Sequence, residues 1–233
     1  MNAIVTGATK GMGRAIARQL AEHHYNLFLC SRNQGELEDF RHELLSIFPS
    51  LTIHIKAADI GDREELAAFA GFVQQRAETI DVLINNAGLF LPSSILEEDE
   101  HTFDKQLAVN VLAPHYLCKV FGRGMKARGS GHIINISSIA AVHPVKTAGS
   151  YSVTKGALLN LTSVLREELM EYGVKVTAIL PGSTLTGSWT GTTIPADRFI
   201  DPDDIANAVI MCLQASRGGN VDEIIIRPTL GNI

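Results

Sequence analysis

Residues 2–13 read Asn-Ala-Ile-Val-Thr-Gly-Ala-Thr-Lys-Gly-Met-Gly and carry the strongest indication of the fold. A short apolar run ends at Gly7, and an amphipathic run follows Gly13. This order predicts a strand, a glycine turn and a helix whose N-terminus can bind a phosphate group. The spacing is Gly-x-x-x-Gly-x-Gly, not the Gly-x-Gly-x-x-Gly of the commonest dinucleotide-binding fold. A helix that starts after an ordinary tight turn is the alternative.

Apolar runs and amphipathic segments alternate along the rest of the chain. Further strands are expected at residues 26–31, 51–57, 80–84, 132–137, 175–180 and 223–226, and helices at 33–48, 63–78, 98–128, 151–172 and 202–214. This pattern predicts an α/β protein with a single Rossmann-type, doubly wound parallel sheet of about seven strands and helices on both faces. We expect one domain over residues 1–233, with Pro114 breaking the longest helix and a short substrate loop at about 183–200.

Composition bounds the possible functions. Of the 233 residues, 45% are hydrophobic and 19% are charged, which is typical of a globular protein with a sizeable core. The net charge of −5 argues against nucleic acid as a partner. The three cysteines are widely separated, which favours reduced thiols in a cytoplasmic protein without a metal site. No apolar run approaches the roughly 18 residues of a membrane helix, and the first strand begins too early for a signal peptide.

The end of the second strand bears on cofactor choice. NAD sites place an Asp or Glu here, which accepts hydrogen bonds from the ribose 2′-hydroxyl. This chain has Ser31 and Arg32 instead, and no acid until Glu36. An arginine pairs well with a 2′-phosphate, and Lys10 in the glycine loop could reach the same group. These residues favour NADP(H) over NAD, and two ordinary surface cations are the alternative.

Polar side chains also follow the third and fourth strands. Asp59 could accept a hydrogen bond from an adenine amino group, or could cap the helix at 63–78, although Asp62 fits that cap better. Residues 85–88, Asn-Asn-Ala-Gly, place small and amide side chains where a cofactor crevice is expected. Asn110 stands among apolar neighbours, as a residue that bonds to another segment or as a satisfied core amide.

A third group of polar residues follows the fifth strand. Tyr151 and Lys155 are four residues apart and would lie on one face of a helix. An ammonium group there would favour phenolate and lower the tyrosine pKa from about 10. Ser138, at the mouth of the strand, could hold a substrate oxygen against that phenol. Alone, Tyr-x-x-x-Lys is also compatible with a solvated lysine and a half-buried tyrosine.

Together these motifs resemble the short-chain dehydrogenase/reductase family of the classical type. The resemblance rests on Thr6-Gly-Ala-Thr-Lys-Gly-Met-Gly13, Asp59, Asn85-Asn-Ala-Gly88, Asn110, Ser138, Tyr151-x-x-x-Lys155 and Pro181-Gly182. They occur in the family's order and near its spacings, from Asn2 to about Pro228. The chain departs from the family at its end, where a short Glu-Ile-Ile-Ile-Arg-Pro tail replaces a glycine-rich one.

The resemblance implies roles for individual residues. Tyr151 would be the general acid and base, Lys155 would lower its pKa and bind the nicotinamide ribose, and Ser138 would hold the substrate oxygen. The Asn110 backbone carbonyl would anchor a water in a proton relay. With Ser31 and Arg32, the implied cofactor residues are Gly7, Thr9, Lys10, Gly11, Met12, Gly13, Asp59, Ile60, Asn86, Ala87, Gly88, Tyr151, Lys155, Pro181, Gly182, Thr184 and Thr186.

The substrate side is open in the sequence. His143 and Trp189 are candidate pocket walls beside Ser138 and Tyr151; a water-facing loop residue and an aromatic ring packed under its own loop are the respective alternatives.

The expected function is an NADPH-dependent oxidoreductase that interconverts a small-molecule carbonyl and an alcohol. A 3-oxoacyl-[acyl-carrier-protein] reductase is an alternative, with Lys126 and Arg128 available to an acidic carrier. Residues 170–172, Met-Glu-Tyr, offer no second cation, which favours small carbonyls. A non-catalytic NADP-binding sensor or scaffold is the second alternative. We expect a homodimer or homotetramer, with the helices of Asn110 and Tyr151 available for a dimer contact.

Overall fold

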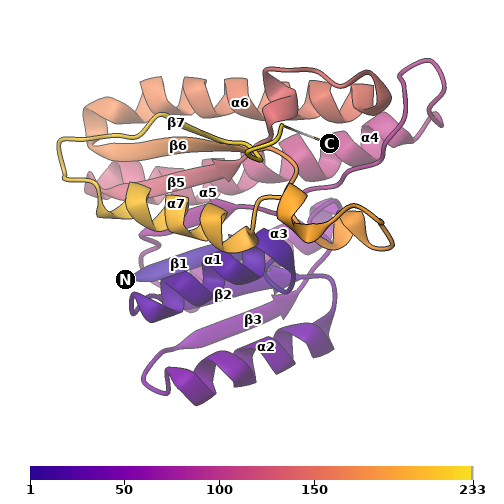
Figure 1. Cartoon of the computed structure of the whole chain (residues 1–233). Coiled ribbons are helices and arrows are strands. Elements are labelled where there is room, and N and C mark those ends of the chain that lie inside the picture. The colour runs from indigo at the N-terminus through magenta and orange to yellow at the C-terminus, as the bar shows by residue number, and fades with distance from the viewer. Residues whose placement is uncertain (232) are drawn as a thin grey trace.

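Seven parallel strands form one sheet in the order β3-β2-β1-β4-β5-β6-β7 (Figure 1). The computed structural model describes residues 1–231 and 233, with the Ser188 side chain left aside. The strands are β1 (Asn2–Thr6), β2 (Asn26–Ser31), β3 (Ile53–Ala57), β4 (Val82–Asn85), β5 (Gly131–Ile136), β6 (Val174–Pro181) and β7 (Glu223–Ile226). The predicted fold class is confirmed.

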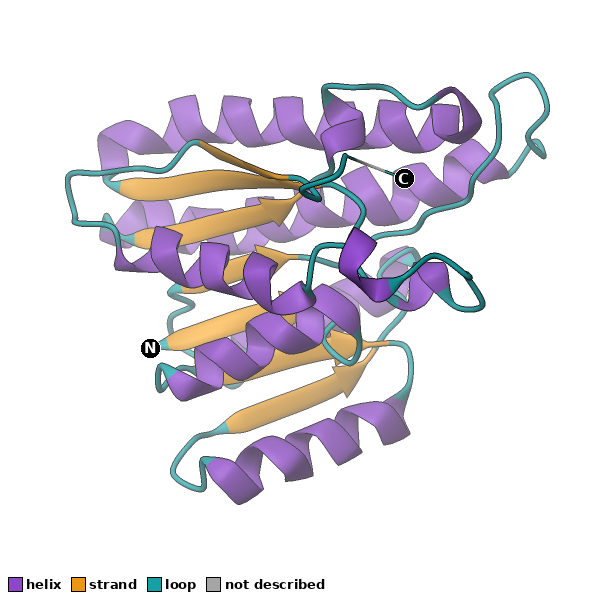
Figure 2. Cartoon of the chain, in the orientation of Figure 1, coloured by secondary structure: helices purple, strands orange, loops and turns teal. Residues whose placement is uncertain are grey.

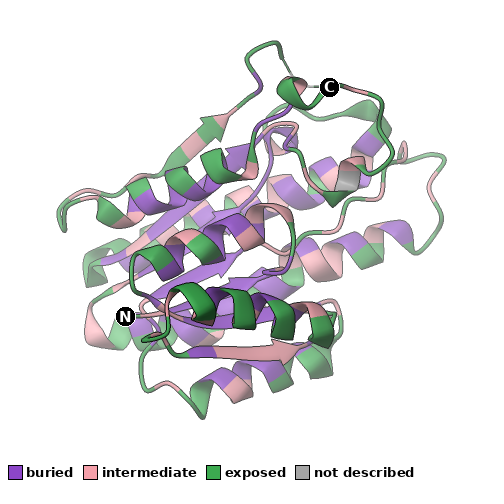
Figure 3. Ribbon diagram, turned by 60° about the horizontal axis from the view of Figure 1, so that its bottom comes forward, coloured by how far each residue is buried: buried purple, intermediate pink, exposed green. Residues whose placement is uncertain are grey.

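Helices cover both faces of the sheet (Figure 2). One layer holds α1 (Gly11–Glu22), α2 (Gln34–Ile47) and α7 (Pro202–Gln214), and the other holds α3 (Arg63–Gln74), α5 (Ala113–Arg128) and α6 (Gly149–Leu169). Successive strand residues serve opposite cores: Ala3 and Val5 pack in the first, and Ile4 packs in the second. The buried residues accordingly concentrate in the sheet and on the inner helix faces (Figure 3).

The strand order reverses between β1 and β4, which are neighbours in the sheet. From β1 the chain proceeds outward to β2 and β3, and it then crosses back to β4. The loops that leave β1 and β4 therefore diverge, and a crevice opens at the carboxyl ends of these two strands. This topological switch point is where doubly wound sheets bind their ligands.

Side-chain caps fix several helix ends where the sequence predicts them. The Asp62 carboxylate accepts hydrogen bonds from the backbone N–H groups of Glu64 and Glu65, both at 2.9 Å. Asp201 accepts one from the Asp203 N–H, also at 2.9 Å. Gly173 adopts a left-handed φ of 70° after the short helix η4 (Met170–Tyr172) that extends α6. Such glycines end helices because they lack a Cβ atom.

The helix predicted for residues 98–128 is wrong as one element. It consists of α4 (Thr102–Leu107), a π-helical turn η1 (Ala108–Leu112) and α5, with Pro114 in the first turn of α5. The chain stays helical at Pro114, and the expected break takes the form of a π-helical turn just before the proline. Proline has no N–H to donate to the Asn110 carbonyl, and its ring crowds that carbonyl, so the wider turn relieves the conflict.

A buried histidine in β5 makes the free energy of unfolding depend on pH in the acidic range. His132 Nε2 lies 2.8 Å from Thr177 Oγ1, and burial, with a smaller effect of the Lys175 charge, lowers the His132 pKa to about 4. The unfolded chain binds a proton near pH 6.5, so between pH 6.5 and 4 it holds more protons than the folded chain. This contribution to stability is therefore complete above pH 6.5 and is lost as the pH falls toward 4.

We expect the stability difference between the wild type and His132→Gln to shrink by roughly 2 to 3 kcal/mol from pH 7 to 4.5. Urea unfolding at both pH values measures it. His143→Gln, a change at an exposed histidine, should leave the wild-type pH dependence intact. Parallel pH profiles for wild type and His132→Gln would contradict the prediction.

Candidate active site

The switch-point crevice has a volume of about 1030 Å³, at the upper end of the range for ligand pockets. Most of the predicted cofactor residues line it, namely Gly7, Thr9, Lys10, Gly11, Met12, Gly13, Ser31, Arg32, Asp59, Ile60, Asn86, Ala87, Gly88, Tyr151, Lys155 and Thr186. Pro181, Gly182 and Thr184 are not part of its lining. The roles of these residues in binding stay predictions.

The glycine loop and the segment after β4 are fastened to each other. Thr6 Oγ1 accepts hydrogen bonds from the N–H groups of Asn86 and Ala87, at 3.1 and 3.0 Å. Asn86 Nδ2 returns one to the Thr6 carbonyl at 2.9 Å. Gly7 has a φ of +65°, and a Cβ atom there would lie 3.0 Å from the Ala87 Cα atom. The absent side chains leave a backbone cradle that fits a pyrophosphate.

The adenosine end of the crevice is polar. Thr9 Oγ1 and Ser31 Oγ lie 2.9 Å apart, Arg32 is exposed beside them, and Lys10 Nζ is 2.7 Å from Glu36 Oε1. A site with these hydroxyls and cations fits a 2′-phosphate. Asp59 lines the crevice, as predicted, and its Oδ1 accepts a hydrogen bond from the Gly61 N–H at 2.9 Å.

Lys155 and Tyr151 lie at the other end. Lys155 is 3% exposed, and its ammonium donates a hydrogen bond to the Ile136 carbonyl at 3.0 Å. Burial lowers the Lys155 pKa to about 8. Burial raises the Tyr151 pKa, and a hydrogen bond with the Ser138 hydroxyl opposes that effect.

The expected direction of the Tyr151 pKa shift is therefore corrected. The Lys155 ammonium lies 5.8 Å from the centre of the Tyr151 ring. At that separation, the loss of water around the phenol outweighs the attraction of the ammonium for a phenolate. The tyrosine is consequently held in its neutral form, which is the form that can give a proton.

Ser138 faces Tyr151 from the end of β5. It begins the short helix η2 (Ile139–Ala141), and its Oγ accepts a hydrogen bond from the Ala140 N–H at 3.1 Å. The same hydroxyl lowers the pKa of Tyr151 through a hydrogen bond. Ser138 is thus near enough to Tyr151 to affect the Tyr151 pKa, although it is not part of the crevice lining.

Asn110 joins three segments that are distant in sequence. Its Oδ1 accepts a hydrogen bond from the Leu89 N–H at 2.8 Å, and its Nδ2 donates to the Leu89 carbonyl at 2.9 Å and to Thr154 Oγ1 at 3.0 Å. The side chain therefore bonds to other segments and is also a satisfied core amide, so both alternatives hold. The relay role of its backbone carbonyl stays a prediction.

A short apolar wall beside Tyr151 was missed by sequence reasoning. It consists of Leu89, Phe90 and Leu91, directly after the Asn-Asn-Ala-Gly motif. The Phe90 and Tyr151 rings meet edge to face, 4.9 Å apart at 83°. Gln106 Oε1 accepts a hydrogen bond from the Leu91 N–H at 3.1 Å. The other unpredicted lining residues are Cys30, Ala58, Gly61, Asp62, Asp104, Lys105, Ala108, Val109, Ile136, Ser137 and Gly187. The apolar triplet after the motif was the available signal.

The two residues predicted to form a wall of the substrate pocket lie outside the crevice. His143 is exposed in the loop after η2, and Trp189 packs its ring on Phe199, with centroids 4.9 Å apart. Neither lines the crevice. In both cases the structure favours the alternative that the sequence left open, because each side chain is placed by its own loop.

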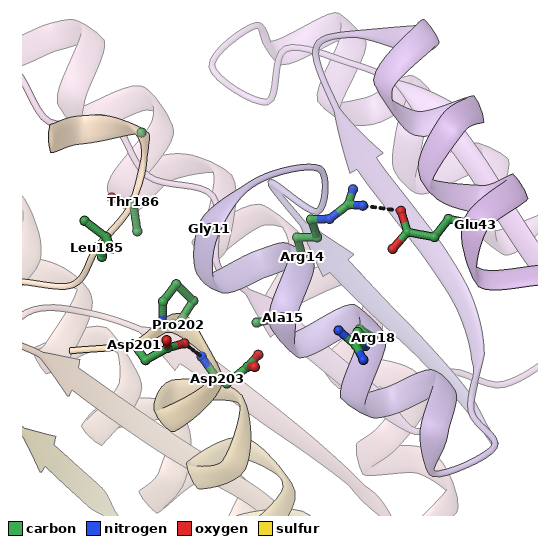
Figure 4. Close-up of a pocket in the computed structure, with 11 residues that line it drawn as sticks. Gly11, Arg14, Ala15, Arg18, Glu43, Leu185, Thr186, Asp201, Pro202 and Asp203 are labelled. Atoms are coloured by element: carbon green, nitrogen blue, oxygen red, sulfur yellow. Dashed lines mark hydrogen bonds and ion pairs between the residues drawn. The ribbon is translucent and has the colours of Figure 1, made fainter. Parts of the chain in front are cut away.

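A smaller cavity of about 420 Å³ lies between α1, the start of α7 and residues 185–187 (Figure 4). In it Arg14 points toward Glu43, to which it forms an ion pair. Gly11, Thr186 and Gly187 line both this cavity and the crevice. A Cβ atom at Gly11 would lie 2.9 Å from Thr186 Cγ2, so the substrate loop touches the glycine loop.

Two further properties concern the whole described chain. None of its helices is both long and apolar enough to span a membrane. Within residues 1–231 and 233, no group of His, Cys, Asp and Glu side chains is arranged to hold a metal ion.

A doubly wound sheet with a phosphate cradle and a facing tyrosine and serine is the architecture of a dinucleotide-dependent oxidoreductase. The sequence model of the family described as short chain dehydrogenase matches residues 1–194. The chain belongs to this family, and the resemblance noted in its sequence is confirmed.

Known proteins of similar sequence and structure support this family assignment. An uncharacterized oxidoreductase of Staphylococcus aureus (strain MRSA252) is 36% identical over 227 residues, which cover 97% of this chain and 96% of that protein. A metagenomic short-chain oxidoreductase in complex with NADP is 32% identical with a TM-score of 0.85, covering 98% and 97% of the two chains. An alcohol dehydrogenase from the archaeon Thermococcus sibiricus, complexed with 5-hydroxy-NADP, is 28% identical with a TM-score of 0.90, covering 100% and 98%.

Proposed function

We propose that this protein interconverts a carbonyl compound and an alcohol with NADP(H), with Tyr151 as its acid and base. The observation that carries the proposal is that Tyr151 and the buried Lys155 line the same crevice as the glycine loop, with Lys155 Nζ 5.8 Å from the centre of the Tyr151 ring. Arg32 and Lys10 line this crevice as well. The two solved relatives with NADP-type ligands support the choice of cofactor.

The protein's own residues transfer the proton. When bound, NADPH supplies the hydride that reduces the carbonyl carbon. The Ser138 and Tyr151 hydroxyls hold the carbonyl oxygen, and Tyr151 Oη gives it a proton as negative charge develops. The raised Tyr151 pKa keeps the phenol protonated at neutral pH, as reduction requires. The Lys155 ammonium stabilises the phenolate that remains, and in alcohol oxidation the same phenolate accepts the proton.

The surroundings support a free carbonyl compound with an apolar substituent. Phe90 is 41% exposed and lies against Tyr151, so a carbonyl at the phenol places its substituent on an apolar wall. The cations that a carrier protein would use are engaged within the chain. Lys126 Nζ stacks 4.0 Å from the centre of the Tyr172 ring, and Arg128 binds the Ile80 carbonyl and lies 3.8 Å from Asp81.

A substrate panel tests the proposal. NADPH oxidation is followed with free ketones and aldehydes, a 3-oxoacyl thioester and its carrier-bound form, and NADPH binding is measured separately by fluorescence. We expect turnover of free ketones, with apolar substituents preferred. Turnover of the carrier-bound form alone would establish the 3-oxoacyl reductase instead. Tight NADPH binding with no turnover on the whole panel would establish the sensor or scaffold and exclude the enzyme.

We further propose a cytoplasmic homodimer or homotetramer. Leu112, Val153 and Val164 are large apolar side chains exposed on η1 and α6, and they support contact between copies there. Sedimentation equilibrium measures the mass in solution. A monomer at micromolar concentration would contradict this assembly.

Arg32→Asp should reverse the preference between the two nicotinamide cofactors. Loss of a charge-assisted contact to the 2′-phosphate costs about 1.5 to 3 kcal/mol, so NADPH should bind about 10- to 100-fold more weakly. NADH should bind as well as before or better, since the new carboxylate can accept from a 2′-hydroxyl. Fluorescence titration with both cofactors measures the change.

The matched control is Arg217→Asp, which makes the same charge change at an exposed residue beyond α7. It should leave both affinities unaltered. An unchanged preference in Arg32→Asp would show that Arg32 is an ordinary surface cation.

A further inference from the structure

A carboxylate lies among the side chains that would receive the 2′-phosphate. Glu36 is in the first turn of α2, and its Oε1 is 2.7 Å from Lys10 Nζ. Its backbone N–H is bound by the cap residue Asn33 at 3.1 Å, which fixes where the side chain starts. The side chains of Glu36 and Lys10 are 34% and 71% exposed, so the pair lies at the rim of the crevice.

Glu36 binds one donor of this site, the Lys10 ammonium. A hydrogen bond from Lys10 lowers the Glu36 pKa, and a hydrogen bond from Thr9 acts in the same direction. The Thr9 hydroxyl in turn lies 2.9 Å from Ser31 Oγ. Lys10, Thr9 and Ser31 all line the crevice as donors, and a carboxylate from within the chain already binds one of them, Lys10.

A carboxylate and a phosphate compete for such donors because both are oxyanions that accept charge-assisted hydrogen bonds. A 2′-phosphate that reaches Lys10 either displaces Glu36 or shares the ammonium with it at close range. The first course breaks an existing ion pair, and the second places like charges side by side. Either course weakens phosphate binding. A ribose 2′-hydroxyl carries no charge, and a carboxylate can accept its hydrogen bond.

We infer that Glu36 is a specificity-determining residue that competes with the 2′-phosphate for Lys10. It opposes Arg32, so the chain binds NADP(H) less tightly than its cations alone would allow and retains affinity for NAD(H). The inference rests on the proposed cofactor and is independent of the carbonyl substrate.

The test uses two fragments that carry no nicotinamide, 2′,5′-ADP and 5′-AMP, titrated calorimetrically into wild type and Glu36→Gln. Glutamine keeps the size of the side chain and removes its charge. Because an exposed ion pair is weak, the expected gain is modest: 2′,5′-ADP should bind about three- to fivefold more tightly to Glu36→Gln. The affinity for 5′-AMP should stay equal or fall.

Two controls isolate the mechanism. Glu38→Gln makes the same change on the same helix, at a carboxylate that accepts a hydrogen bond from Gln34 at 2.9 Å and does not pair with Lys10. It should leave both affinities unchanged. In a Lys10→Met background the gain from Glu36→Gln should largely disappear, because Glu36 acts through Lys10.

Equal or weaker binding of 2′,5′-ADP by Glu36→Gln would overturn the inference, and so would an equal gain in Glu38→Gln. These outcomes leave the proposed reaction standing, since ketone turnover is measured separately. Failure of both fragments to bind any of the variants would instead remove the proposed cofactor and this inference with it.

Discussion

Tyr151→Phe loses about 10²- to 10⁴-fold in kcat for ketone reduction, the usual contribution of a general acid. The substitution removes one hydroxyl and keeps the ring, and with it the edge-to-face contact with Phe90 at 4.9 Å. The carbonyl oxygen then has Ser138 to hold it and no group to protonate it. Stopped-flow or steady-state NADPH absorbance measures the loss, and NADPH fluorescence should show an affinity within about twofold of wild type.

Tyr172→Phe is the matched control, because it removes a phenolic hydroxyl from a partly exposed residue at the end of α6. It should keep wild-type activity. The direction of reaction adds a second check. Since burial raises the Tyr151 pKa above its ordinary value of about 10, wild-type alcohol oxidation should increase as the pH rises through the alkaline range, where phenolate forms. A Tyr151→Phe enzyme that still reduces ketones at the wild-type rate would show that another group supplies the proton.

Gly13→Ala should damage both stability and cofactor binding. A Cβ atom at residue 13 would lie 2.1 Å from the Gly7 carbonyl oxygen and 2.4 Å from Asn86 Nδ2. Asn86 Nδ2 is bound to the Thr6 carbonyl, so α1 must move away from the glycine loop. We expect a loss of about 1 to 3 kcal/mol in the free energy of unfolding and at least tenfold weaker NADPH binding.

Gly124→Ala provides the comparison for this substitution. Gly124 is in α5, and its added methyl group would meet nothing within 4 Å. An alanine there should be neutral or stabilise the helix by up to about 1 kcal/mol, with NADPH affinity unchanged. Urea unfolding and fluorescence titration compare the two variants, and equal behaviour would contradict the tight packing at Gly13.

Local chemistry explains what the sequence could predict. The glycine loop, the cap at Asp62 and a helix irregularity near Pro114 each depend on a few neighbouring residues. The approach of Ser138 to Tyr151 was also within reach, because a strand end and the following helix are close in sequence. These features were predicted correctly for that reason.

Features that depend on packing between distant segments could not be predicted from the sequence. The wall at Phe90 is positioned through residues 106 and 110, which belong to another helix. The Tyr151 pKa rises because of burial, which no four-residue spacing reveals. Trp189 was a candidate wall on residue type alone, and its orientation is set by Phe199 ten residues later.

The hydrogen bonds that hold the apolar wall affect which of its residues can vary. Asn110 and Gln106 form hydrogen bonds with backbone groups of Leu89 and Leu91. These bonds do not involve the side chain of the residue between them. The backbone of the wall is therefore held in place independently of the side chain at position 90. Under the proposed function, substitutions at Phe90 would change the apolar surface beside the substrate, and they would also change the ring contact with Tyr151.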